Sequence, residues 1–294
     1  MLERWLPFQP RMTSLLQISD PHFGTVQPEV MQALRQFSIE QQPDVLVLSG
    51  DITQRALVSE FAQARAFCDS LAIPQMLAIP GNHDVPLFDL YQRVFTPYAR
   101  YLQAFGPVIE SVVTTPLLQV IGVKTTRRWR HKNGEVSSAQ VARVVAELKR
   151  SAAAQLRIVV VHQPVHVMHA EDQHDRLRGW KPAVQAWSRA GADIVMGGHI
   201  HLPSLCDLSA RVEGLERRLW CVQAGTALST RVRADIPNSI NLLRYQGPDL
   251  PFSCRLERWD FQSALGRFEC VQFTELPLGS HDNGLPASVP ASQY

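Results

Sequence analysis

The segment Val45-Leu46-Val47-Leu48-Ser49-Gly50-Asp51 carries the clearest signal of the fold. Its four apolar residues lie between the turn-forming pairs Pro43-Asp44 and Gly50-Asp51. A short, uninterrupted apolar run between such turns is typical of a strand that is buried on both faces. The segment therefore predicts a central strand of an α/β protein.

Strands and helices alternate on either side of this segment, through the first two-thirds of the chain. Apolar residues at helical spacing predict one helix that opens near Pro28 and another that is capped by Ser59. A later helix begins with Ser137-Ser138-Ala139-Gln140, which has the form of a capping box. After residue 203 strand-sized segments dominate. The whole pattern indicates one compact α/β domain with a β-rich C-terminal third.

The domain is expected to span residues 13–274. Residues 1–12 form an N-terminal extension without the apolar stretch of a secretory signal. Residues 275–294 hold three prolines, two glycines and few large apolar side chains, so we expect a disordered tail. The longest apolar runs are too short to cross a bilayer, and the expected location is cytoplasmic.

Composition excludes several classes of protein. With 45% hydrophobic and 19% charged side chains, the 294-residue chain is an ordinary globular protein. A net charge of +2 predicts no nucleic-acid polymer as partner. The five cysteines form no CxxC pair, which argues against a disulfide framework and against a thiolate metal site. None of these features predicts an oligomeric state.

Residues of the types that bind metals follow five of the expected strands. Ligands of open α/β sheets bind at the carboxyl ends of the strands, so these five turns can meet in one crevice. Their carboxylate, amide and imidazole groups suit manganese, iron, zinc or similar ions. The turns are Asp20-Pro21-His22, Gly50-Asp51, Gly81-Asn82-His83-Asp84, Val161-His162-Gln163-Pro164 and Gly197-Gly198-His199-Ile200-His201.

In the order of these five motifs the chain resembles the calcineurin-like metallophosphoesterases, across residues 13–245 or so. Within that family it is most similar to the bacterial class III cyclic-nucleotide phosphodiesterases. The resemblance implies two stacked mixed β-sheets flanked by helices, in αββα layers. It also implies two bound metal ions, of manganese, iron or zinc. The seven implied ligands are Asp20, His22 and His201 for the first ion, Asn82, His162 and His199 for the second, and Asp51 as the bridge.

The resemblance also implies a metal-dependent phosphodiester hydrolase. A hydroxide that bridges the two ions would attack phosphorus in line with the leaving group. His83 would lie beside the phosphate, as a proton donor or charge stabiliser, and Asp84 would orient it. The implied substrate is a small phosphodiester, with a 3′,5′-cyclic nucleotide as the first choice.

Three further features each have two interpretations. The basic run that contains Arg127 and Arg128 could grip a phosphate, but a charge run is more often a solvated face. Arg231 has the same two interpretations. The segment with His166, His169 and His174 is either a surface loop or a lid over the metals.

Other functions remain open at this point. A pyrophosphatase of a nucleotide-lipid, of the UDP-2,3-diacylglucosamine type, would use the same metal site. That alternative predicts an exposed apolar groove formed by Phe88, Leu90, Tyr91, Phe95 and Tyr98. A broad phosphoesterase is also possible. A nuclease would need a stronger basic excess. A catalytically inactive scaffold would lack ligands or His83, and the chain has them all.

Overall fold

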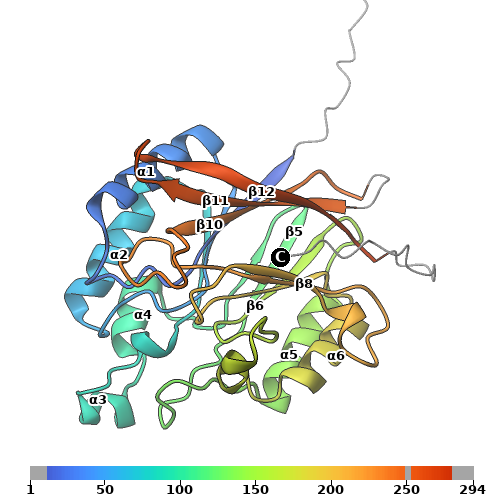
Figure 1. Cartoon of the computed structure of the whole chain (residues 1–294). Helices are drawn as coiled ribbons and strands as arrows, with labels where there is room; N and C mark the ends of the chain where they lie inside the picture. Colours follow the sequence, from blue (N-terminus) through green and yellow to red (C-terminus); the bar gives the residue numbers. More distant parts are fainter. Residues whose placement is uncertain (1–11, 249–252, 280–294) are drawn as a thin grey trace, which may run out of the picture.

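Two mixed β-sheets lie face to face and carry helices on their outer faces (Figure 1). The computed structural model describes residues 12–248 and 253–279. One six-stranded sheet has the order β12-β11-β10-β1-β2-β3, and the other has the order β4-β5-β6-β7-β9-β8. This is the expected αββα arrangement.

The elements alternate as expected along the first two-thirds of the chain. The helices are α1 (Pro28–Gln41), α2 (Val58–Ser70), α3 (Leu90–Phe95), α4 (Ala99–Phe105), α5 (Ser138–Leu148) and α6 (Trp180–Arg189), with 3-10 turns η1 (Asn82–Asp84), η2 (Ala170–Asp175) and η3 (Leu208–Ala210). The strands are β1 (Thr13–Ile18), β2 (Val45–Leu48), β3 (Gln75–Ala78), β4 (Val112–Thr114), β5 (Leu118–Gly122), β6 (Leu156–Val160), β7 (Ile194–Gly197), β8 (Ser204–Asp207), β9 (Trp220–Gln223), β10 (Ser239–Tyr245), β11 (Ser253–Gln262) and β12 (Arg267–Pro277).

Alternation along the central strands produces the layers. Val45 and Val47 of β2 point into the core between the two sheets, whereas Leu46 and Leu48 point into the core beneath α1 and α2. The same split holds for β6, where Val159 packs under α5 and α6. Because successive side chains of a strand face opposite ways, an unbroken apolar run fills two cores at once.

Helix α2 begins differently from the expectation. Ser59 is not its cap, because the helix already starts at Val58. The Glu60 carboxylate accepts hydrogen bonds from the backbone N–H groups of Arg55 and Leu57, at 2.8 and 3.2 Å. The Glu60 carboxylate thus binds the N–H of the N-cap residue Leu57, which has no partner within the helix, together with the N–H of Arg55.

The C-terminal boundary also differs. Strand β12 continues to Pro277, three residues beyond the expected end of the domain, and Leu276 is fully buried between the sheets. The indole N–H of Trp220 donates to the carbonyl of Pro277 at 3.0 Å. Two buried leucines, Leu276 and Leu278, within a polar, proline-containing stretch gave too weak a pattern to predict this strand end. Residues 1–11 and 280–294, which hold most of the expected extension and tail, lie outside the described residues.

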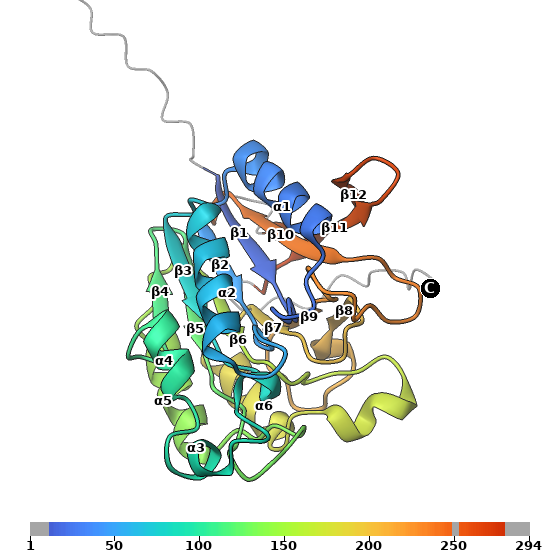
Figure 2. The ribbon, with the colours of Figure 1, turned by 90° about the vertical axis from the view of Figure 1, so that its left-hand side faces the viewer.

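Parallel pairing brings the motif-bearing strand ends together. β1 pairs in parallel with β2, and β2 with β3, while β6 pairs in parallel with β7. Their carboxyl ends point toward one edge of the sandwich, and helices α1 and α2 lie against the outer face of the first sheet (Figure 2). None of the helices described in the structure is both long enough and apolar enough to span a bilayer.

The capping box at the start of α5 is expected to stabilise the protein. Ser137 Oγ accepts from the N–H of Gln140 at 3.3 Å, and Gln140 Oε1 accepts from the N–H of Ser137 at 3.1 Å. We expect Ser137→Ala to lower the free energy of unfolding by about 1 kcal/mol, as other cap removals do. The neighbouring exposed Ser138→Ala should change it by less than about 0.5 kcal/mol. Urea denaturation followed by circular dichroism measures both, and equal effects would contradict the assignment.

Candidate metal centre

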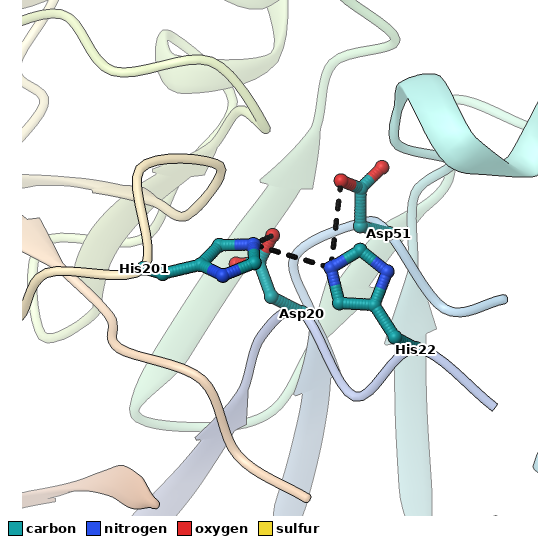
Figure 3. A group of neighbouring side chains, drawn as sticks. All are labelled: Asp20, His22, Asp51 and His201. Atoms are coloured by element: carbon teal, nitrogen blue, oxygen red, sulfur yellow. Dashed lines mark hydrogen bonds and ion pairs between the residues drawn. The ribbon is translucent and has the colours of Figure 1, made fainter. Parts of the chain in front are cut away.

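The first group of ligands gathers where β1, β2 and β7 end (Figure 3). His22 Nε2 and His201 Nε2 lie 3.2 Å apart. Asp20 Oδ1 is 3.4 Å from His201 Nε2, and Asp51 Oδ2 is 3.9 Å from His22 Nε2. All three residues expected to hold the first ion, and the expected bridge, therefore converge on one point.

The second group forms beside it. Asp51, His162 and His199 present ligand atoms that all lie within 4.8 Å of one another. His162 Nε2 is 3.3 Å from Asp51 Oδ1 and 3.3 Å from the amide oxygen of Asn82. The rings of His162 and His199 are 5.0 Å apart. The structure thus brings together the expected ligands of the second ion as well.

Asp51 belongs to both groups and faces each with a different oxygen. Oδ2 lies on the side of His22, and Oδ1 lies on the side of His162. A carboxylate in this position can bridge two cations. Three buried imidazole nitrogens, His22 Nδ1 and both nitrogens of His199, have no hydrogen-bond partner in the described structure. Unpaired buried nitrogens beside carboxylates fit a site that binds metal ions.

The backbone at the ligands is unusual. Asp20, His22, Asp51, His199 and His201 all have positive φ angles, between 45° and 77°. Few non-glycine residues adopt this left-handed region, although Asp and His do so more often than most. Such conformations persist only where the surroundings enforce them, and they gather at functional sites. Here strand-end turns enforce them, because the N–H of Asp20 donates to the Gly50 carbonyl and that of His22 to the Asp51 carbonyl, both at 3.1 Å.

Backbone carbonyls select the nitrogen that two of the imidazoles offer to the site. A carbonyl oxygen can only accept a hydrogen bond, so the ring nitrogen beside it carries the proton. His162 Nδ1 donates to the Ser49 carbonyl at 2.8 Å, and His201 Nδ1 donates to the Arg231 carbonyl at 2.6 Å. Each ring therefore presents Nε2 to its group, as metal-binding histidines with an oriented second nitrogen do.

Burial and neighbouring charges both shift the pKa values of the acids and imidazoles in the two groups. Burial raises the pKa of the Asp20 carboxyl, but His201 outweighs this effect and the pKa falls to about 2. Burial alone would lower the pKa of His162, but the Asp51 carboxylate reverses the shift and raises this pKa to about 9. Burial dominates at His22 and lowers its pKa to about 3. Without a cation, a proton on His162 supplies the positive charge that Asp51 requires.

Glycines make room for these side chains. A Cβ on Gly198 would collide with Ser19 Oγ and would lie 2.5 Å from Asp20 Oδ2. A Cβ on Gly81 would collide with the backbone and carboxylate of Asp51. The two glycines are therefore required by close approach to the two carboxylates.

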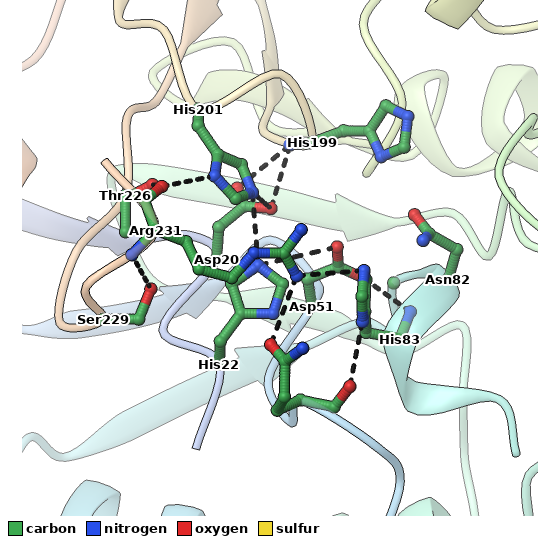
Figure 4. Close-up of polar contacts among 12 residues, drawn as sticks. Asp20, His22, Asp51, Asn82, His83, His199, His201, Thr226, Ser229 and Arg231 are labelled. Carbon is green, nitrogen blue, oxygen red and sulfur yellow. Dashed lines mark hydrogen bonds and ion pairs between the residues drawn. The ribbon is translucent and has the colours of Figure 1, made fainter. Parts of the chain in front are cut away.

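His83 lies at the edge of the groups, next to Arg231 (Figure 4). Its backbone N–H donates to Asp51 Oδ1 at 2.8 Å, and its Nδ1 donates to the Gln54 carbonyl at 2.9 Å. Arg231 Nη1 lies 3.1 Å from His83 Nε2 and 3.2 Å from Gln54 Oε1. Because a guanidinium can only donate, Nε2 accepts this hydrogen bond and the ring is neutral here.

Asp84 does not contact the ring of His83. Its buried carboxylate accepts from the N–H groups of Ile52, Thr53 and Gly81, at 3.0, 2.7 and 2.8 Å. Burial and the neighbouring Asp51 raise its pKa to about 6, against the effect of these donors. Asp84 thus ties the turn after β2 to the turn after β3, and it positions His83 through the backbone instead of through the imidazole.

The structure separates the three arginines that were considered for substrate binding. Only Arg231 reaches the metal centre. Arg127 donates to Gln140 Oε1 at 2.7 Å and to nearby carbonyls, so it fastens its loop to the start of α5. Arg128 donates to the Val94 carbonyl at 2.7 Å. The solvated or structural interpretation fits these two residues better than a clamp.

The sequence reasoning missed Asp175. Its Oδ1 lies 3.6 Å from His199 Nε2, and Lys132 pairs with it at 2.8 Å. It directly follows the segment that contains His166, His169 and His174. Neither of the two metal-binding groups found among the described residues includes any of these three histidines. The acidic residues of η2 were the one sequence feature that pointed to a role for Asp175. Ser49 and Gln54 were missed too, because both orient a histidine through a backbone carbonyl, which any residue provides.

The shared carboxylate predicts metal stoichiometry. We expect Asp51→Asn to lose both ions because each group contains Asp51, whereas Asp20→Asn should retain the second ion. Asp69→Asn, at an exposed pair with Arg65, is the matched control and should keep both. Elemental analysis of dialysed protein measures the metal content. Two ions retained by Asp51→Asn would contradict a bridging role.

The raised pKa of His162 predicts how the metal-free protein responds to pH. The folded value of about 9 exceeds the unfolded value of 6.5, so the folded state binds the extra proton between them. This stabilisation is complete below pH 6.5 and is lost as the pH rises toward 9. We expect the melting temperature of chelator-treated protein to fall across that window. Asp51→Asn, which lacks the carboxylate, should show a smaller fall, and a rise in the wild type would contradict the assignment.

Comparison with solved structures shows a shared fold. The chain is similar to the purple acid phosphatase PPD1 from yellow lupin (Lupinus luteus) seeds, with a TM-score of 0.66, 14% identity, and coverage of 90% of this chain and 54% of that chain. It is also similar to a dimetal phosphatase from Danio rerio, with a TM-score of 0.62, 13% identity and coverage of 90% and 98%. The structure of PhoD matches with a TM-score of 0.59, 10% identity and coverage of 89% and 72%. The chain thus spans about half the length of the lupin phosphatase.

Sequence comparison gives the family. No curated protein sequence matches the chain significantly. The profile of the calcineurin-like phosphoesterases, however, matches residues 13–203. This range covers well over half of the chain and contains all seven expected ligands together with His83. The chain belongs to the calcineurin-like phosphoesterase family.

Proposed function

We propose that this phosphoesterase uses two metal ions to hydrolyse a small phosphodiester. The observation that carries the proposal is the pair of donor groups that share Asp51, with His83 and Arg231 beside them. Asp20, His22, His201 and Asp51 would hold one ion. Asn82, His162, His199 and Asp51 would hold the other. The oxygen and nitrogen donors favour manganese, iron or zinc, and the choice among them stays open.

Two neighbouring cations supply an activated water and charge stabilisation at phosphorus when they are bound. The protein's own residues keep the surroundings fixed. Asp84 joins the turns after β2 and β3, and Asp51 holds the backbone of His83. The Ser49 and Arg231 carbonyls fix the orientation of two ligand rings. Such preorganisation avoids the cost of reorienting dipoles during the reaction.

His83 and Arg231 form the substrate side of the proposed site. A phosphate placed between them would receive hydrogen bonds from the guanidinium, which can grip two oxygens at once. When the guanidinium turns to the phosphate, His83 Nε2 would be free to take up a proton from solvent. The ring would then pass that proton to the departing alkoxide and return to its neutral form. General acid help of this kind typically contributes about 10²–10⁴-fold in rate.

The choice of a phosphodiester comes from the resemblance, and the arrangement of His83 and Arg231 is compatible with it. The guanidinium can grip two oxygens of a diester phosphate, and an alkoxide leaving group benefits from a proton donor. The preference for a 3′,5′-cyclic nucleotide, and the place in the class III branch, come from the motif series alone. Two of the matched structures are named as phosphatases, so a phosphomonoester is the competing substrate class.

One observation favours a nucleotide-lipid pyrophosphate as a second candidate. Phe88, Leu90, Tyr91 and Phe95 are exposed, as that alternative requires. Tyr98, the fifth residue of the expected apolar groove, turns inward instead and bonds to Thr126 through its hydroxyl. The four exposed apolar side chains follow the turn that carries His83 in the chain.

A hydrolysis panel tests the proposal. We expect the manganese-loaded protein to release 4-nitrophenol from bis(4-nitrophenyl) phosphate faster than from 4-nitrophenyl phosphate. The panel then compares cyclic nucleotides with nucleotide-lipid pyrophosphates. His83→Ala should reduce kcat about 10²–10⁴-fold with little loss of bound metal.

The exposed His131→Ala is the matched control and should keep the wild-type rate. A faster reaction with the monoester would replace the diester assignment with a phosphomonoesterase. Inactivity of the loaded protein toward every member of the panel, with both ions bound, would overturn the proposal.

A further inference from the structure

One end of the molecule carries large apolar side chains in contact with solvent. Phe88 is 83% exposed and Tyr91 is 73% exposed, and helix α3 buries none of its residues. In both views α3 lies at the end of the molecule away from β11 and β12 (Figures 1 and 2). We call this the apolar end and define it by Phe88, Leu90, Tyr91, Phe95 and Trp129.

Hydrogen bonds fix the backbone segments that carry these exposed side chains. Arg93 donates to the carbonyls of Pro86 and Arg130, at 3.0 and 2.9 Å. Arg128 donates to the Val94 carbonyl at 2.7 Å, which joins the loop after β5 to α3. The rings of Tyr91 and Phe95 contact each other with centroids 4.9 Å apart. An exposed apolar patch that is held in place by such contacts marks an interaction surface.

The apolar end is surrounded by positive charge. The two segments that form it, residues 85–100 and 124–132, contain seven Lys or Arg residues and a single acid, Asp89. That acid is paired with Arg100 at 3.0 Å. Arg127 and Arg130 pair with Glu135 at 4.0 and 3.0 Å, and Lys132 pairs with Asp175 at 2.8 Å. Arg93 and Arg128, which lie beside the exposed apolar side chains, donate to backbone carbonyls instead. The positive charge available to a partner is therefore that of these two guanidinium groups.

We propose that the apolar end docks on an anionic lipid bilayer. Aromatic rings and leucine side chains enter the headgroup region, while the surrounding cations bind anionic headgroups. The charges of Arg128 and Arg93 are available for this purpose, because these guanidinium groups donate to backbone carbonyls and not to carboxylates. Tryptophan and tyrosine favour this depth of a membrane, since their rings are apolar with a polar edge.

Charge also argues against a second copy of the chain as the partner. A twofold interface would place the same surface on both sides, and two strongly basic segments would then face each other at a cost. A bilayer that contains acidic lipids provides the opposite charge. The proposal does not depend on the substrate. Phe88, the first residue of the apolar end, lies four residues after Asp84 in the chain.

Vesicle binding tests the proposal with the full chain. We expect co-sedimentation with vesicles of phosphatidylglycerol and phosphatidylcholine, weakened by added salt, and little with phosphatidylcholine alone. The triple variant Phe88→Ser, Tyr91→Ser, Phe95→Ser should bind about tenfold or more weakly, because it loses three inserted side chains. The tryptophan emission of the wild type should shift to the blue on the anionic vesicles, and Trp129→Phe should abolish that shift.

The matched control changes three exposed apolar residues elsewhere, Ile39→Ser, Val271→Ser and Phe273→Ser, and should bind vesicles like the wild type. Hydrolysis of a soluble phosphodiester by both triple variants should stay unchanged, which separates docking from catalysis. Equal loss in both triple variants, or equal binding to both kinds of vesicle, would overturn the proposal. So would a dimer in light scattering that only the first triple variant dissociates.

Discussion

Two carboxylates buried among imidazoles are the constraint on which the structure depends. Asp20 and Asp51 are 0% and 2% exposed, and an isolated buried carboxylate would be very costly. The turns supply what is needed: the N–H of His199 and the hydroxyl of Ser19 donate to Asp20, and the N–H of His83 donates to Asp51. Those donors come from three different strand ends, so the site requires both sheets to be in place.

This requirement explains why the core and the metal centre cannot be separated. β1, β2, β6 and β7, which precede most of the expected ligands, are fully buried. Gln17 of β1 donates to the Gly197 carbonyl of β7 across the two sheets, at 3.0 Å. A shift of one sheet against the other would move Asp20 away from the N–H of His199. Close packing between the sheets therefore sets the spacing of the ligands.

The residue pattern predicted the alternation of strands and helices, and the resemblance carried by the five motifs predicted the two stacked sheets. Val45–Leu48 is a fully buried strand, as its apolar run indicates, and the side chains expected as ligands converge where the strands end. The sequence did not predict roles that depend on contacts between residues far apart in the chain. Asp175 contacts His199 through a loop whose path no local pattern determines, and Asp84 proved to bind backbone N–H groups instead of an imidazole. Arg127 and Arg231 looked alike in the sequence, and only their surroundings separate them.

The left-handed backbone at five of the expected ligands has a consequence for changing the metal preference of the proposed centre. Aspartate, asparagine and histidine tolerate such a conformation, whereas branched side chains at Cβ do not, so the turns themselves limit which residues can be exchanged. A protein engineer who copied the seven side chains onto another scaffold would also have to copy the turns. Selectivity among cations is therefore easier to alter through the neighbours that orient the ligands, such as Asp175, than through the ligands themselves.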